Sequence, residues 1–179
     1  LHEGSNLISF YVLPEDNSVG NVLTLNAIHA IAGEGEAAMN TDIGWVGSLT
    51  TVSYENGYWL IVNEAGTLHL TGIPIQPDQL YTLHTGNNLI SYPLSDCSDI
   101  SEVIPDDIEE CLYAITSEGV AALHDSDIGW VGSLTTLCQY KGYWFVNQCE
   151  EIEFIFDESA SVARQNVVST SPYPYYQSS

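Results

Sequence analysis

The sequence predicts a mainly β protein built from two tandem repeats, each a small antiparallel sheet or barrel with one short helix. The first observation is an internal duplication, because residues 42–51 recur letter for letter as residues 127–136. The second is a Gly-Tyr-Trp motif that follows each copy, at residues 57–59 and 142–144. The third is that the apolar runs are short and separated by Gly, Pro, Asn and Asp, which is typical of strands joined by turns. An α+β fold is the alternative.

The duplication divides the chain into four parts: repeat 1 over residues 1–72, a linker over 73–82, repeat 2 over 83–157 and a tail over 158–179. The linker contains two prolines and no glycine, so we expect a stiff connector. The tail is rich in serine and is expected to lead to a neighbouring domain. The chain opens without Met inside a repeat, so we expect a mature chain or a fragment of a longer one.

The same order of elements is predicted in both repeats. A buried strand follows a Gly-x-Asn turn, and a short helix follows a segment that offers N-cap residues. Strands then alternate with turns, and the clearest strand begins at Gly-Tyr-Trp. In repeat 1 the predicted strands cover residues 6–12, 27–32, 45–46, 49–52, 58–62 and 67–70, with the helix near residues 19–23.

The charge balance excludes several classes of partner. Two basic residues stand against 24 acidic ones, which gives a formal net charge of −22. Such a polyanion releases no counterions from phosphates, so nucleic acid is excluded as a direct partner. Anionic lipid surfaces are disfavoured for the same reason, and no apolar run approaches the length of a membrane span. We expect an extracellular protein, from a saline setting in which salt screens its self-repulsion.

The four cysteines all lie in repeat 2, at Cys97, Cys111, Cys138 and Cys149. An even number without a Cys-x-x-Cys spacing favours two disulfides over zinc, with free buried thiols as the alternative. Three pairings are possible. Locality along the chain favours Cys97 with Cys111 and Cys138 with Cys149, although hairpin geometry argues against the second pair.

Aromatic side chains are the candidate ligand contacts. Trp45 and Tyr58 in repeat 1 correspond to Trp130 and Tyr143 in repeat 2, and such rings stack on sugars or anchor a protein partner. Adjacent residues of a strand point to opposite faces, so the Tyr and the Trp of Gly-Tyr-Trp cannot both face the core. We expect the Trp in the core and the Tyr exposed as a contact.

No catalytic motif is present in the sequence, and enzyme activity is not expected. Asp42 in repeat 1, and Asp125 and Asp127 in repeat 2, lie in the loops that precede the two copies of Ile-Gly-Trp, where carboxylates and carbonyls could converge on Ca²⁺. Their spacing does not match an EF-hand, and a solvated acidic loop is the alternative. No other cofactor is expected beyond this possible structural calcium.

The paired motifs resemble a known class of tandem β-repeats with a "GxNLISxP" opening strand and a "GYW" closing strand. Repeat 2 keeps the proline of this pattern as Pro93, where repeat 1 has Tyr11. Such repeats occur in secreted and cell-surface proteins of bacteria and archaea, and in marine metagenomic and viral sequences. The resemblance covers about residues 1–72 and 83–157, and it implies non-catalytic modules of large surface proteins.

Together these observations predict a structural or adhesion module of a larger secreted, cell-surface or virion-associated protein. Its partners would be neighbouring domains or other surface proteins. A carbohydrate-binding module that uses exposed aromatics is the alternative, and a hydrolase with an acidic site is a third hypothesis.

Overall fold

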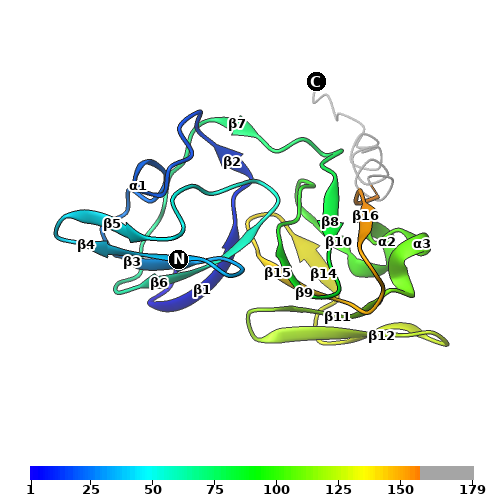
Figure 1. The fold of residues 1–179 in the computed structure, drawn as a ribbon. Coiled ribbons are helices and arrows are strands. Elements are labelled where there is room, and N and C mark those ends of the chain that lie inside the picture. The colour runs from blue at the N-terminus through cyan, green and yellow to red at the C-terminus, as the bar shows by residue number, and fades with distance from the viewer. Residues whose placement is uncertain (158–179) are drawn as a thin grey trace, which may run out of the picture.

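The computed structural model describes residues 1–157, and the predicted tail lies outside the described residues. The prediction of a mainly β fold with two similar halves is confirmed. The two halves lie side by side, with repeat 1 in blue to cyan and repeat 2 in green to orange (Figure 1). Within residues 1–157 no helix is long and apolar enough to cross a membrane.

Each repeat forms one five-stranded antiparallel sheet with the same strand order. The order is β1-β6-β3-β4-β5 in repeat 1 and β9-β15-β11-β12-β13 in repeat 2. The first sheet consists of β1 (Gly4–Ser9), β3 (Ile28–Ala32), β4 (Ala37–Thr41), β5 (Gly44–Gly47) and β6 (Gly57–Val62). The second consists of β9 (Gly86–Ile90), β11 (Leu112–Ser117), β12 (Val120–Asp125), β13 (Gly129–Gly132) and β15 (Tyr143–Asn147).

The helices are single turns: α1 (Val19–Val22), α2 (Ile100–Val103) and α3 (Asp106–Glu109). Repeat 2 therefore has one helix more than predicted, because Pro105 ends the first turn and its extended backbone starts a second. In repeat 1 the predicted helix is shorter than expected. It ends at Val22, and Leu23 leaves the helical conformation.

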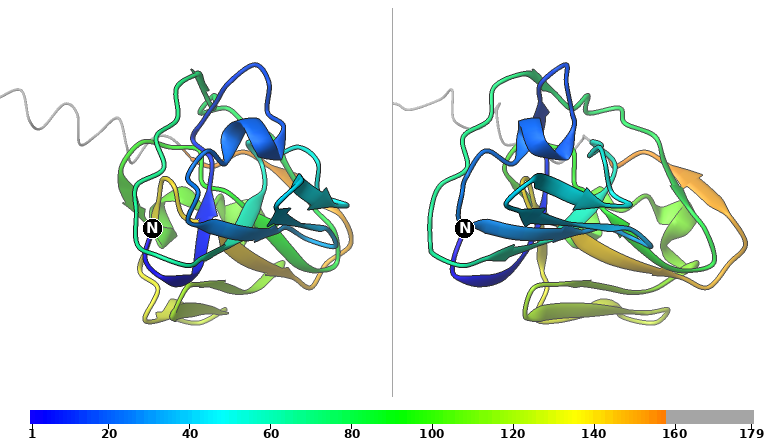
Figure 2. Two further views of the ribbon diagram at one scale, coloured as in Figure 1. Left: turned by 90° about the vertical axis from the view of Figure 1, so that its left-hand side faces the viewer. Right: turned by 60° about the vertical axis from the view of Figure 1, so that its left-hand side comes forward.

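Three short ladders complete the fold, namely β2 (Val12–Leu13) with β7 (Ile73–Pro74), β8 (Tyr81–Leu83) with β16 (Ile152–Phe154), and β10 (Cys97–Asp99) with β14 (Thr136–Cys138). The two ends of the predicted linker are thus strand residues, one paired with each repeat. Figure 2 shows this connection running over one side of the two sheets. The strand predicted over residues 67–70 does not form a strand.

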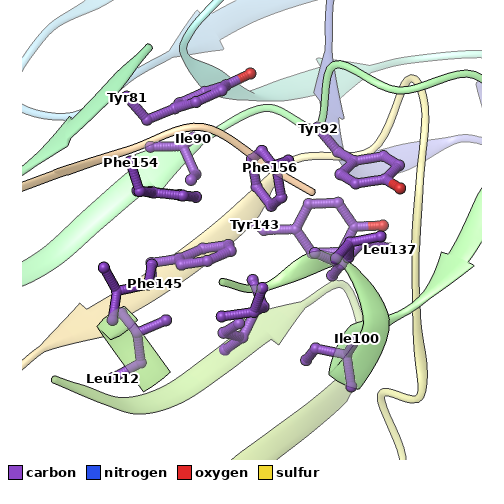
Figure 3. Packing of buried hydrophobic residues seen from close by; sticks show 14 of the residues in the cluster. Tyr81, Ile90, Tyr92, Ile100, Leu112, Leu137, Tyr143, Phe145, Phe154 and Phe156 are labelled. Atoms are coloured by element: carbon purple, nitrogen blue, oxygen red, sulfur yellow. The ribbon is translucent and has the colours of Figure 1, made fainter. Parts of the chain in front are cut away.

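Each sheet covers its own hydrophobic core. In repeat 2 the core is aromatic, with Tyr81, Phe145, Phe154 and Phe156 packed ring against ring (Figure 3). The core of repeat 1 consists mainly of aliphatic residues around Phe10 and Tyr58.

The expectation for Gly-Tyr-Trp was wrong, because Tyr58 and Tyr143 lie in the core with exposures of 1% and 2%. Trp59 and Trp144 lie half-buried on the opposite face. A buried tyrosine needs a hydrogen-bond partner, and here each hydroxyl accepts one from a backbone amide, Ser53 N at 2.9 Å and Cys138 N at 2.7 Å. Burial raises the pKa of Tyr143 to about 12.

Two disulfides are present, as predicted, but the predicted pairing was wrong. The bonds join Cys97 to Cys138 and Cys111 to Cys149. Cys97 and Cys138 lie directly opposite each other in the β10–β14 ladder. The pairing therefore follows from strand pairing and not from closeness along the chain. Disulfides persist in an oxidising environment, which supports an extracellular location.

Candidate contact sites

The two repeats meet through equivalent residues, as in a dimer with a two-fold axis. Ile8 of repeat 1 forms a β-bridge with Lys141 of repeat 2, and the equivalent Ile90 forms one with Asn56. The flanking hydrogen bonds are also reciprocal, from Ser9 N to Tyr140 O at 3.1 Å and from Ser91 N to Glu55 O at 2.8 Å. The junction is therefore built twice from the same elements.

The glycine of each Gly-Tyr-Trp motif lies at this junction. A Cβ at Gly142 would stand 2.7 Å from the carbonyl oxygen of Ile8, and one at Gly57 would stand 3.0 Å from that of Ile90. Real Cβ atoms essentially never come closer than 3.0 Å to another heavy atom, so a side chain at Gly142 would force the backbone to shift, and one at Gly57 would displace the Leu89 side chain. The motif thus serves both the core and the contact between repeats.

Two histidine–glutamate pairs also connect the repeats reciprocally. His2 Nε2 lies 2.5 Å from Glu118 Oε1, and His84 Nε2 lies 2.6 Å from Glu34 Oε1. The second oxygen of each carboxylate accepts a hydrogen bond from a backbone amide of β1 or β9, at 3.1 Å and 3.0 Å. The two glutamates that the repeats share, Glu34 and Glu118, are therefore both engaged in the contact between the repeats.

The contacts of these pairs shift the titration of both histidines. Hydrogen bonds to the carbonyl of the next residue, and then to the partner glutamate, raise the pKa of His2 and of His84. Burial acts to raise the pKa of Glu118, but the hydrogen bonds from His2 and from the Leu7 amide outweigh it and hold this pKa below its usual value. Both histidines are exposed, so solvent screens these interactions.

The duplicated stretch forms the turn and second strand of a hairpin in each repeat, β4–β5 and β12–β13. Both hairpins expose large apolar side chains at equivalent positions. At the turns, Ile43 is 90% exposed and Ile128 is 74% exposed. Beside them lie exposed cross-strand pairs, Met39 with Val46 and Leu123 with Val131. The two hairpins lie at opposite ends of the molecule (Figure 1).

Structural requirements explain only part of the identity between the two copies. Leu49 and Leu134 are buried, and a Cβ at Gly47 or Gly132 would stand 2.1 Å from a carbonyl oxygen of the neighbouring strand. The exposed Ile and Val make no comparable core contact. Exposed apolar residues that gather in one place mark interaction sites more often than stability elements.

Beside Trp130 lies a polar hollow of about 340 Å³. Trp130 Nε1 donates a hydrogen bond of 2.9 Å to Glu109 Oε1, and the ring packs against His124 with centroids 5.1 Å apart. Glu109 belongs to α3, the additional helix of repeat 2. The hollow is lined by Asp99, Ser101, Glu109, Ile128 and Trp130, among others.

The predicted ligand contacts therefore differ in accessibility. Trp45 and Trp130 lie on the hairpins, are half-buried, and each packs against the hydrophobic core of its own repeat. Tyr58 and Tyr143 present no ring face to a ligand, because they are buried.

The residues suggested for calcium are not gathered into a site. No group of three or more His, Cys, Asp or Glu side chains among residues 1–157 could hold a metal ion. Asp42 is exposed in the β4–β5 turn. Asp125 accepts hydrogen bonds from the amides of Asp127 and Ile128, so its carboxylate stabilises the β12–β13 turn.

Sequence reasoning missed the exposed apolar positions and the Glu109–Trp130 contact. A signal for the first was present, because an isoleucine between Asp and Gly in a turn has no place in a core. The Glu109–Trp130 contact depends on α3, and no motif in the sequence predicts that helix.

Comparison with protein-family models, curated proteins and solved structures found no match for this chain.

Proposed function

We propose that the chain is a non-catalytic, extracellular structural or adhesion module of a larger secreted, cell-surface or virion-associated protein. The observation that carries the proposal is the pair of equivalent hairpins, each with exposed apolar side chains centred on Ile43 or Ile128. The two disulfides and the charge of −22 suit a soluble protein in an oxidising, salt-containing environment.

The energetics favour multivalent contacts. Burying one large apolar side chain contributes roughly 1.5–3 kcal/mol, and each hairpin offers three. Association costs about 4–15 kcal/mol in lost freedom and ordering, so one hairpin alone would bind weakly. Two hairpins at opposite ends of the module, or several modules in one long chain, would bind more tightly together than one hairpin alone, because linkage raises the effective concentration of the second site. The acidic surface favours partners that are neutral or basic around an apolar patch.

The test is an adhesion assay with beads that carry the protein. The Ile43→Glu/Ile128→Glu variant should lose adhesion to a panel of extracellular proteins that retains wild-type beads. Ile155→Glu is the matched control, because Ile155 is 43% exposed and lies outside both hairpins. Equal adhesion of all three proteins would contradict the proposal, and turnover of a polymer substrate would contradict its non-catalytic part.

A carbohydrate-binding module is the second candidate, favoured by the hollow beside Trp130. A half-buried indole next to carboxylates and a hydroxyl combines a stacking face with acceptors for sugar hydroxyls. On a glycan array this function predicts binding that Trp130→Ala abolishes and that the Ile43→Glu/Ile128→Glu variant keeps. An array without bound glycans removes this candidate.

A further inference from the structure

Each five-stranded sheet ends in an edge strand of the duplicated hairpin. Among residues 1–157, β5 has β4 as its one strand neighbour and β13 has β12. Because hydrogen bonds alternate along an antiparallel ladder, every second residue of an edge strand points its peptide groups away from the sheet. The β4–β5 ladder closes on the pair Thr41–Gly44, so these residues are Trp45 and Gly47 in β5 and their equivalents in β13.

Both edges are exposed and lack the features that usually prevent the addition of a further strand. Val46 is 52% exposed and Val131 is 46% exposed, and the glycine that follows each valine is exposed as well. Natural edge strands are commonly protected by lysine, by proline or by inward-pointing charges. Both strands read Gly-Trp-Val-Gly, which contains none of these, and only their length of four residues limits pairing.

A row of uncharged side chains crosses each sheet and ends at this edge. Cross-strand partners form the row, which consists of Ile61, Ala30, Met39 and Val46 in repeat 1 and of Val146, Ala114, Leu123 and Val131 in repeat 2. The rows lie on the face opposite the core, because Leu60 and Ala122, which precede row residues in their strands, are core residues. Two sheets that meet edge to edge would continue the row from one copy to the next.

The identity of the two edges points to a second copy of this chain as the partner. The exposed valines make no core contact that would require the same residue twice. A strand that pairs with its own equivalent forms both sides of one contact, which accounts for a single sequence at both edges. Charge favours the same partner. A copy that also carries −22 can approach closely only where charged side chains are absent, and β4, β5 and β13 contain none.

We propose that copies of this chain join through these edges, with β5 or β13 of one copy paired antiparallel with β5 or β13 of the next. This inference rests on the proposed function and names the partner of its two hairpins. Trp45 and Gly47 supply the backbone hydrogen bonds, so Val46 lies opposite the corresponding valine of the second copy. Since the hairpins lie at opposite ends of the molecule, repeated joints build an open chain of modules (Figure 1).

The size of the contact makes each joint weak. A stable interface buries about 800 Å² on each partner, which is more than a four-residue strand and a few side chains supply. Repulsion between like-charged copies weakens the joint further at low salt. We therefore expect monomers in dilute solution, and association at millimolar protein in moderate NaCl or when modules are tethered side by side.

Cysteine trapping tests the register of the joint. In the proposed pairing the Cα atoms of opposed valines lie about 4.5 Å apart, within the span of a disulfide. Met39 and Leu123 are the matched positions, because they are 50% and 48% exposed and lie one strand further from the edge than Val46 and Val131. Across the joint they would be separated by three strand spacings, about 14 Å.

On oxidation at millimolar protein, Val46→Cys/Val131→Cys should therefore form intermolecular disulfides at least about tenfold faster than Met39→Cys/Leu123→Cys. Equal rates for the two variants would overturn the proposal, because random collision and face-to-face packing of the sheets do not distinguish the two positions.

Sedimentation equilibrium tests the number of joints in the same conditions. The wild-type protein should form species larger than dimers, Val46→Glu or Val131→Glu alone should stop at dimers, and the double variant should be a monomer. Ile155→Glu adds the same charge outside both hairpins and should associate like the wild-type protein. A wild-type protein that stays monomeric, or a double variant that associates as the wild type does, overturns the proposal.

Failure of this inference can be told apart from failure of the proposed function. If the wild-type protein stays monomeric while its beads adhere to extracellular proteins, the hairpins bind a different partner, and only the inference of a second copy falls. If the wild-type protein forms chains while its beads adhere to no protein of the panel, the inference stands and the adhesive part of the proposed function falls.

Discussion

Substitution of the junction glycines gives the sharpest stability prediction. In Gly142→Ala the new Cβ would stand 2.7 Å from the carbonyl oxygen of Ile8 and 3.0 Å from Leu7 Cδ1. Overpacking of this kind costs roughly 1–3 kcal/mol. The loss of glycine freedom in the unfolded chain offsets about 0.4–1 kcal/mol of this cost. We therefore expect a net destabilisation of about 1–2 kcal/mol.

The closest neighbour differs at the equivalent Gly57, so the two substitutions should lower the stability by different amounts. In Gly57→Ala the shortest approach, 2.8 Å, is to Leu89 Cδ1, the end of a flexible side chain that moves more easily than backbone. Gly57→Ala should therefore destabilise less than Gly142→Ala. For a chain of this length, 1 kcal/mol lowers Tm by about 2–4 °C.

Gly20→Ala is the matched control. Gly20 lies in α1, and a Cβ there would meet Trp45 Cδ1 at 3.5 Å, an ordinary contact. Because alanine is favoured over glycine inside a helix, this variant should be neutral or stabilised by up to about 1 kcal/mol. Thermal unfolding followed by circular dichroism, with disulfides intact, compares the three. A Tm for Gly142→Ala equal to or above that of Gly20→Ala would refute the close approach of the repeats.

Three further outcomes follow from charge and covalent bonding. The raised pKa of His2 and His84 stabilises the fold below the unfolded value of 6.5, and this contribution is lost as pH rises through the folded pKa. The difference in Tm between the wild-type protein and the His2→Gln/His84→Gln variant should therefore shrink between about pH 5 and pH 9. A difference that stays constant over this range would contradict a stabilising role of the two histidine–glutamate pairs. Replacing Cys97 and Cys138 with serine opens a loop with a sequence separation of 41, so calorimetry should register a loss of about 4 kcal/mol. An unchanged Tm would mean that the reduced chain is held equally well by the β10–β14 ladder. Tm should also rise from low to moderate NaCl, because screening relieves the repulsion within a net charge of −22. A flat or falling salt profile would indicate that bound cations already pair the acids.

Much of the fold could be predicted from the sequence, because duplication and alternation are local signals. The recurrence of residues 42–51 predicted two similar halves, and the turn residues predicted short antiparallel strands. The alternation of Tyr58, Leu60 and Val62 in β6 identifies the core-facing side. The sequence-based expectation placed the Trp of Gly-Tyr-Trp in the core instead, although a tyrosine whose hydroxyl has a backbone partner fits a core equally well.

Contacts across strands and between repeats could not be predicted in this way. The partner of Cys97 depends on the β10–β14 register, which no single segment encodes. The shared His2/His84 and Glu34/Glu118 were visible in the duplication, but the sequence does not say that each histidine meets the glutamate of the other repeat.

Disulfide trapping tests the central claim, that two equivalent repeats meet reciprocally and form one unit with a hairpin at each end. Ile8 and Lys141 are bridge partners, as are Asn56 and Ile90, and directly opposed β positions lie within the span of a disulfide. The variants Ile8→Cys/Lys141→Cys and Asn56→Cys/Ile90→Cys should each form an additional disulfide on oxidation, identified by mass spectrometry of an unreduced digest. Cross-linking of both pairs is the predicted result, and cross-linking of neither or of only one would contradict the reciprocal junction.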